Sequence, residues 1–253
     1  MKGWLAVAAG GLLLVIALAL DAPAALLDAR VAAATDGRVR IAGATGTLWN
    51  GMGELVLLPR GTRRLLAWHI DAASLLTGEA RGTLALDGSA AQSAAFAFGH
   101  GRTALRNFDA DLPMDALLET AGVPAALGAA GGSVATHVDR FVRTEDALDA
   151  DLSVQWKDAS LPAPASGVRI GLGDISVELR GSGPEIGGLL SNRGGDVDIT
   201  GRLRLDAALH PSLDAALRPR AGIERDRADA IVAALSLVGA PDGQGGYRLN
   251  WPR

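Results

Sequence analysis

The stretch Asp196-Val-Asp-Ile-Thr-Gly-Arg-Leu-Arg-Leu-Asp206 decides the fold class of this chain. Polar and apolar residues alternate along it, and Asp174-Ile-Ser-Val-Glu-Leu-Arg180 repeats the pattern. A period of two gives a strand one apolar and one polar face, because successive side chains point to opposite sides. Both stretches therefore predict antiparallel sheet with one face packed and the other in water.

The same alternation extends through most of the chain beyond residue 25. It recurs at residues 38–41, 83–87, 133–139 and 149–156. Glycine-containing breaks separate these runs and supply the positive-φ positions that tight hairpin turns need. We expect a mainly β fold, a curved antiparallel β-sheet meander with a few short helices.

Three segments have helical rather than strand spacing. They are residues 113–121, 211–218 and 225–238, and glycines follow the first and the last of them. Glycine just beyond an apolar periodic run is a typical helix stop. Residues 245–251 then predict a final strand.

The amino terminus is strongly apolar. After Met1 and Lys2, the eighteen residues Gly3–Leu20 carry no charge. A helix of this length covers about 27 Å, close to the hydrocarbon thickness of a bilayer. We predict one N-terminal transmembrane helix, a retained anchor over residues 1–25 that contacts the membrane through residues 3–25. A cleaved secretory signal is the alternative, since Ala17-Leu-Ala19 and Ala22-Pro-Ala24 offer small-x-small sites.

The charges next to this apolar segment, which we call the leader, predict its orientation in the membrane. Lys2 and the free amino group favour the cytoplasmic side, so the rest of the chain is expected outside the cytosol. We predict one exported β-rich domain over residues 26–253.

Composition excludes several classes of function. A formal net charge of −4 gives no electrostatic reason to expect nucleic acid as a partner. The chain has no cysteine, which excludes disulfides, a thiol nucleophile and cysteine-based metal sites. Hydrophobic residues make up 49% of the chain, enough for a sizeable core.

Patterns that carry chemistry are sparse. The four histidines lie far apart, and no pair has the i, i+4 spacing of a helical zinc site. Asp-x-Asp pairs begin at residues 109, 149 and 196, but the last lacks the glutamate that a calcium loop needs at its twelfth position. Carboxylates at i and i+2 share one strand face, so a solvated face is the simpler interpretation. We predict no catalytic residue, no cofactor and no metal.

The most distinctive stretch is Gly43-Ala-Thr-Gly-Thr-Leu-Trp-Asn-Gly51. A Gly-Thr-Leu-Trp-x-Gly turn followed by a tryptophan-bearing strand, here Leu65–Ile70, resembles protein N of the bacterial type II secretion system. The apolar leader, the step at residues 75–78 and the closing residues 242–251 are similar to that family as well.

The resemblance implies an accessory subunit without catalytic residues. It would be a single-pass protein of the bacterial inner membrane with its β-rich domain in the periplasm, acting as an adaptor in the export of folded proteins. Its partners would be other type II secretion subunits, namely the secretin and the inner-membrane platform proteins. The candidate partner contacts are the motif residues Gly46, Thr47, Leu48, Trp49 and Gly51, together with Trp68.

Other interpretations remain open at this stage. Trp49 can instead be a structural ring packed over close backbone at a hairpin, and Trp68 a core residue of its strand. A curved sheet with an apolar inner face also suits acyl chains, so an AsmA-like protein that binds or bridges lipid is the alternative function. A periplasmic enzyme released by signal cleavage is a third.

Overall fold

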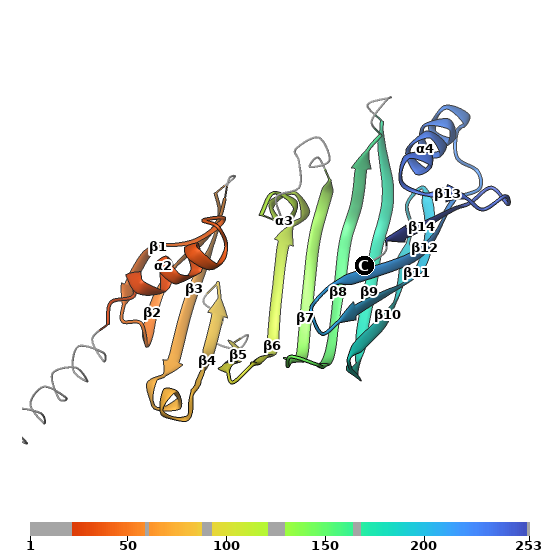
Figure 1. Ribbon diagram of the computed structural model, residues 1–253. Coiled ribbons are helices and arrows are strands. Elements are labelled where there is room, and N and C mark those ends of the chain that lie inside the picture. Colours follow the sequence, from red (N-terminus) through yellow and green to blue (C-terminus); the bar gives the residue numbers. More distant parts are fainter. Residues whose placement is uncertain (1–21, 59–60, 88–92, 121–129, 164–167, 252–253) are drawn as a thin grey trace, which may run out of the picture. The chain divides into compact units, whose positions relative to one another are not determined.

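The computed structural model describes residues 22–58, 61–87, 93–120, 130–163 and 168–251. The chain divides into two compact units, Met1–His100 (unit 1) and Gly101–Arg253 (unit 2). Each unit is mainly antiparallel β-sheet with short helices, which confirms that part of the predicted fold class (Figure 1).

Most of the predicted anchor, residues 1–21, lies outside the described residues. Among the residues that are described, no helix is long and apolar enough to cross a membrane. The single exported domain over residues 26–253 stays a prediction.

The strands of unit 1 pair in sequence order, as a meander of hairpins requires. Its elements are α2 (Ala25–Ala34), β1 (Val39–Gly46), β2 (Asn50–Leu57), β3 (Thr62–Asp71), the 3-10 helix η1 (Ala72–Thr77), β4 (Glu79–Leu86) and β5 (Ser93–Gly99).

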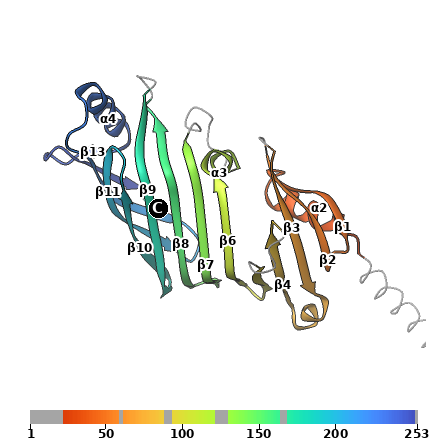
Figure 2. The same ribbon diagram turned by 180° about the vertical axis from the view of Figure 1, so that it is seen from behind.

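The core of unit 1 lies between α2 and one face of the sheet. Ile41, Leu66 and Trp68 are buried there, and Leu27 and Val31 of α2 pack against them. In both Figure 1 and Figure 2, α2 lies across one face of the strands beside it. The alanine-rich sequence of α2 favours a helix, but α2 is not among the three short helices that the spacing predicted.

Unit 2 is also a meander up to β12, after which β14 lies beside β12 and β13 lies outside β14. Its elements are β6 (Arg102–Pro113), α3 (Met114–Thr120), β7 (Gly131–Arg143), β8 (Leu148–Pro162), β9 (Arg169–Gly183), β10 (Glu185–Arg193), β11 (Val197–Asp206), β12 (Pro211–Pro219), α4 (Arg225–Val238), β13 (Ala240–Pro241) and β14 (Tyr247–Trp251).

The sheet of unit 2 is strongly curved. Arg143 at the end of β7 donates from Nε to the carbonyl oxygen of Ala207, just after β11, at 2.8 Å. Leu148 of β8 and Leu205 of β11 meet in one apolar cluster on the inner face. Strands that are several positions apart in the order therefore touch, because the twist of the strands accumulates across the sheet.

The helix α4 packs on the inner face of the same sheet, over strands β11 and β12. Ile231 and Leu235 of α4 are buried against Val197 and Leu217 of the sheet. The helices predicted over residues 113–121 and 225–238 are confirmed as α3 and α4, and the final strand is confirmed as β14.

The helix predicted over residues 211–218 is wrong, since this segment is strand β12. Leu213, Ala215 and Leu217 alternate toward the inner face and pair with β11. Pro211 and Pro219 stand at the two ends of the strand, where a missing amide is tolerated. Packing on both neighbours outweighs the helix propensity of the alanines and leucines.

Candidate functional site

The distinctive motif forms a tight connection between β1 and β2. The amide of Thr47 donates to the carbonyl oxygen of Asn50 at 2.7 Å, and the amide of Asn50 donates to Thr47 Oγ1 at 3.1 Å. Gly46 precedes this turn with φ +89°, and a Cβ at this position would collide with the carbonyl oxygen of Asn50. The turn therefore needs glycine at position 46.

Trp68 of β3 lies directly beneath this turn. Its side chain is buried, with the residue 4% exposed, and its Nε1 donates to the carbonyl oxygen of Leu48 at 3.0 Å. Gly51 is the cross-strand partner of Trp68, and a Cβ on Gly51 would overlap the indole ring. The motif thus combines a glycine with a ring that fills the space left by its missing side chain, and the core interpretation of Trp68 is confirmed.

The remaining motif residues lie nearer the surface. Thr47, Leu48 and Trp49 are half-buried, and the backbone carbonyl of Trp49 accepts from the amide of Ile70 at 2.6 Å. The turn is therefore tied to β3 at both Leu48 and Trp49. A partner contact through these residues stays a prediction.

The segment that leaves the leader is bound to the same turn. The amide of Leu48 donates to the carbonyl oxygen of Ala22 at 2.7 Å, and the amide of Ala24 donates to that of Gly46 at 3.3 Å. Pro23 forms an isolated antiparallel bridge with Thr47. The motif turn is consequently the part of unit 1 to which the segment after the leader is hydrogen-bonded.

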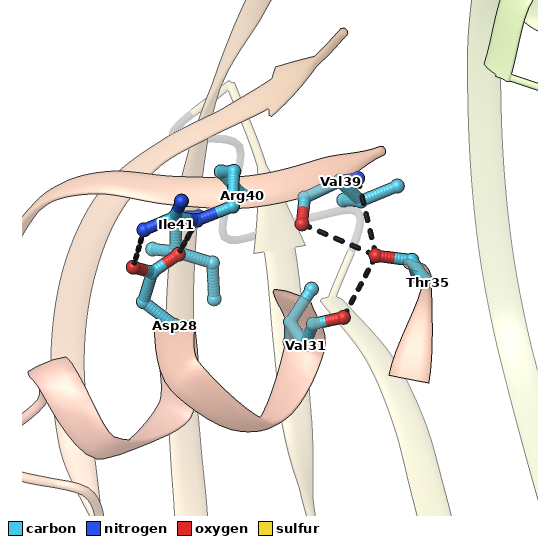
Figure 3. Close-up of polar contacts among 6 residues, drawn as sticks. All are labelled: Asp28, Val31, Thr35, Val39, Arg40 and Ile41. Carbon is cyan, nitrogen blue, oxygen red and sulfur yellow. Dashed lines mark hydrogen bonds and ion pairs between the residues drawn. The ribbon is translucent and has the colours of Figure 1, made fainter. Parts of the chain in front are cut away.

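Asp28 holds α2 to the outer edge of β1 (Figure 3). Its carboxylate accepts from Arg40 at 2.9 and 2.6 Å and from the amide of Ile41 at 2.7 Å. The hydrogen bond from Arg40, followed by that from Ile41, lowers the pKa of Asp28 to about 2 from its ordinary 3.8.

Thr35 closes the same edge near the other end of α2. Its Oγ1 accepts from the amide of Val39 at 3.1 Å and donates to the carbonyl oxygen of Val31 at 2.8 Å (Figure 3). Amides on an edge strand would otherwise be free to pair with another chain. Side chains of Asp28 and Thr35 therefore protect the β1 edge. Their seven-residue spacing, two helical turns, is the sequence signal that sequence analysis missed.

The paired aspartates predicted on solvated strand faces lie in ion pairs on unit 2. Asp111 pairs with Lys157 at 3.5 Å and Asp149 with Arg140 at 3.0 Å. Asp151 pairs with Arg180 at 2.9 Å. These contacts confirm the solvent-face interpretation for the strand pairs.

Asp196 and His137 have more specific surroundings. Asp196 accepts from Arg227 of α4 at 2.6 Å and from the amide of Gly171 at 2.8 Å, so it ties α4 to the sheet. His137 lies 2.6 Å from Asp109 and 3.2 Å from Asp139, and the contact with Asp109 raises its pKa. Within the described ranges, no group of three ionisable side chains has the arrangement of a metal site.

Comparison with known families connects these features. The family model of type II secretion system protein N matches residues 37–250, which include the motif turn, Trp68 and nearly all of unit 2. The chain belongs to the type II secretion protein N family. The resemblance carried by the motif is thereby confirmed. Searches of curated proteins and of solved structures gave no match.

Proposed function

We propose that this member of the protein N family is an accessory, inner-membrane-anchored subunit of the type II secretion system. Residues 1–25 anchor it, and the following β-rich part acts in the periplasm as an adaptor between other subunits. The observation that carries the proposal is the family match over residues 37–250.

Unit 1 offers an apolar surface for such binding. Met52 on β2 and Leu65 on β3 are 63% and 60% exposed. Both lie on the face opposite α2, because their neighbours Gly53 and Leu66 face the core. Ala67 is the cross-strand partner of Met52 on this face. Glu54, the cross-strand partner of Leu65, pairs with Arg63 on the same face, so charged side chains border the exposed apolar ones. An apolar centre with a polar rim is typical of protein-binding surfaces.

Gene deletion tests the proposal directly. Deletion is expected to lower the secretion of folded substrates or the assembly of the secretin, and the full chain is expected to restore it. A chain whose residues 1–21 are replaced by a cleaved signal keeps residues 22–24, which bind the motif turn. This chain should restore less secretion, because the adaptor then leaves the membrane. Unchanged secretion and secretin assembly after deletion would overturn the proposal.

Photo-crosslinking in secreting cells identifies the partner. A photoreactive residue in place of Leu65 should form adducts with the secretin or a platform protein. The same residue in place of Thr200, an exposed polar position on β11, is the matched control and should form few. Adducts of equal yield at both positions would show that this surface is not the contact.

The AsmA-like lipid function is the second candidate. Its groove would have to lie on the inner face of unit 2, where α4 and the curvature of the sheet already cover Val197, Leu217 and Leu148. This packing favours the adaptor. Stoichiometric phospholipid in the purified protein, measured by mass spectrometry, would reverse that preference.

A further inference from the structure

The motif turn lies close to the end of the leader. The apolar run ends at Leu20, and the carbonyl oxygen of Ala22 is hydrogen-bonded to the amide of Leu48. Two residues span at most about 7 Å and one hydrogen bond adds about 3 Å. The backbone of Leu48 therefore lies within roughly 10 Å of the last apolar residue of the leader.

That distance matches the polar layer of a bilayer. The headgroup region on each side of the hydrocarbon core is about 5–8 Å thick. If the leader spans the membrane, as the proposed function holds, the turn cannot leave the neighbourhood of this layer. The hydrogen bonds of Ala22 and Ala24 and the bridge of Pro23 fix it there.

The side chains at this place suit an interface between lipid and water. Trp49 is half-buried in the turn, and tryptophan is enriched at membrane interfaces because its ring is amphipathic. Leu26, in the first turn of α2, is 49% exposed although apolar. Arg30, one turn further along α2, is exposed and makes no ion pair with a described residue, so it is available to lipid phosphate.

We infer that this leader-proximal surface, made of Pro23, Leu26, Arg30, Leu48 and Trp49, lies in the headgroup layer of the membrane. The occupant that covers it is the lipid interface, and the family motif has a second role in seating unit 1 on the bilayer. The inference rests on the proposed function, because it requires the leader to be membrane-embedded. It adds that unit 1 is held at the surface by its own side chains as well as by the leader.

The chain has no cysteine, so a single introduced cysteine can be labelled specifically. The test uses the full chain in phosphatidylcholine vesicles containing phosphatidylglycerol, with a quencher on the upper acyl chain. An environment-sensitive fluorophore is attached at Leu26→Cys. The matched control is Leu58→Cys, an exposed leucine of unit 1 just after β2, at the opposite end of that strand from the motif turn. Flotation of the vesicles with bound protein is measured on the same samples.

The inference predicts several-fold stronger quenching and a blue-shifted emission at Leu26→Cys relative to Leu58→Cys. Protein that floats with the vesicles while both labels are quenched equally would overturn the inference and leave the anchor standing. Protein that does not float would overturn the anchor and the inference with it. Quenching at Leu26→Cys together with adducts from Leu65 in cells would support both roles.

Discussion

The carboxylate of Asp28 accepts two hydrogen bonds from the guanidinium of Arg40, at 2.9 and 2.6 Å, across the gap between α2 and the edge of β1. The same carboxylate accepts from the backbone amide of Ile41. The Asp28 side chain thus binds both the charged group of Arg40 and a backbone amide on the edge strand β1. This contact fixes α2 against the edge of β1.

Replacing Asp28 tests how strongly that contact holds unit 1 together. Asp28→Asn keeps an acceptor for Ile41 but loses the charge that Arg40 binds, so we expect a loss of about 1 kcal/mol in the free energy of unfolding. Arg40 is half-exposed, and solvent screening keeps the value small. Asp36→Asn is the control, because Asp36 is 84% exposed. Equal effects in urea unfolding would contradict a special role for Asp28.

The contribution of Asp28 depends on pH in a defined direction. Its pKa is lowered in the folded protein to about 2 from 3.8, so the folded state binds fewer protons than the unfolded chain in this range. The stabilisation is complete above 3.8 and is lost as the pH falls through about 2. The stability difference between the wild type and Asp28→Asn should therefore shrink over this window. A difference in unfolding free energy that stays constant as the pH falls to about 2 would contradict the lowered pKa of Asp28.

A methyl group at Gly51 should disturb the motif turn. Gly51→Ala places Cβ against the indole of Trp68 and also against the backbone carbonyl oxygen of Thr45, and overpacking of this kind costs about 1–3 kcal/mol. The control is Gly187→Ala on β10, where the nearest atom to the new Cβ is 3.7 Å away. Combining Gly51→Ala with Trp68→Leu should recover part of the loss, since the ring that clashes is gone. Additive losses in the double variant would contradict the packing argument.

The curvature of unit 2 should depend on Arg143. Arg143→Met removes the donor to Ala207 while keeping a long side chain, so we expect a loss of about 1–2 kcal/mol. Amide hydrogen exchange at Ala207 and Leu209 should become faster. Arg106→Met, at an exposed arginine on β6, should leave these amides unchanged. No change with Arg143→Met would show that apolar packing alone sets the curve.

His137 should titrate above its ordinary 6.5, because Asp109 is hydrogen-bonded to its ring. The contact between His137 and Asp109 therefore stabilises the fold when the pH lies below the ordinary pKa of histidine. This stabilisation is lost as the pH rises through the raised pKa of His137. NMR titration of the imidazole measures this directly. Asp109→Asn should move the pKa back down, whereas Asp111→Asn should have a smaller effect. Identical titration curves in the two variants would contradict the pairing.

Short-range pattern accounts for most of the strands. The alternation at residues 174–180 and 196–206 predicts β9 and β11, because a strand with one buried face needs a period of two. The helix α4 was also predictable from its spacing and its glycine stop. The motif at residues 43–51 further indicated the family, which the match over residues 37–250 confirms.

The sequence by itself determined the class of sheet, the family and the solvated faces, since these depend on neighbours along the chain. Only the tertiary structure decided that residues 211–219 form a strand, that Asp28 and Thr35 close the β1 edge, and that Arg143 reaches Ala207. The contact of Arg143 joins groups 64 positions apart in sequence. The contacts of Asp28 and Thr35 span 13 and 4 positions, but they form only because α2 packs beside β1. Local propensity is worth tenths of a kcal/mol per residue, so packing and hydrogen bonds made across the fold outweigh it.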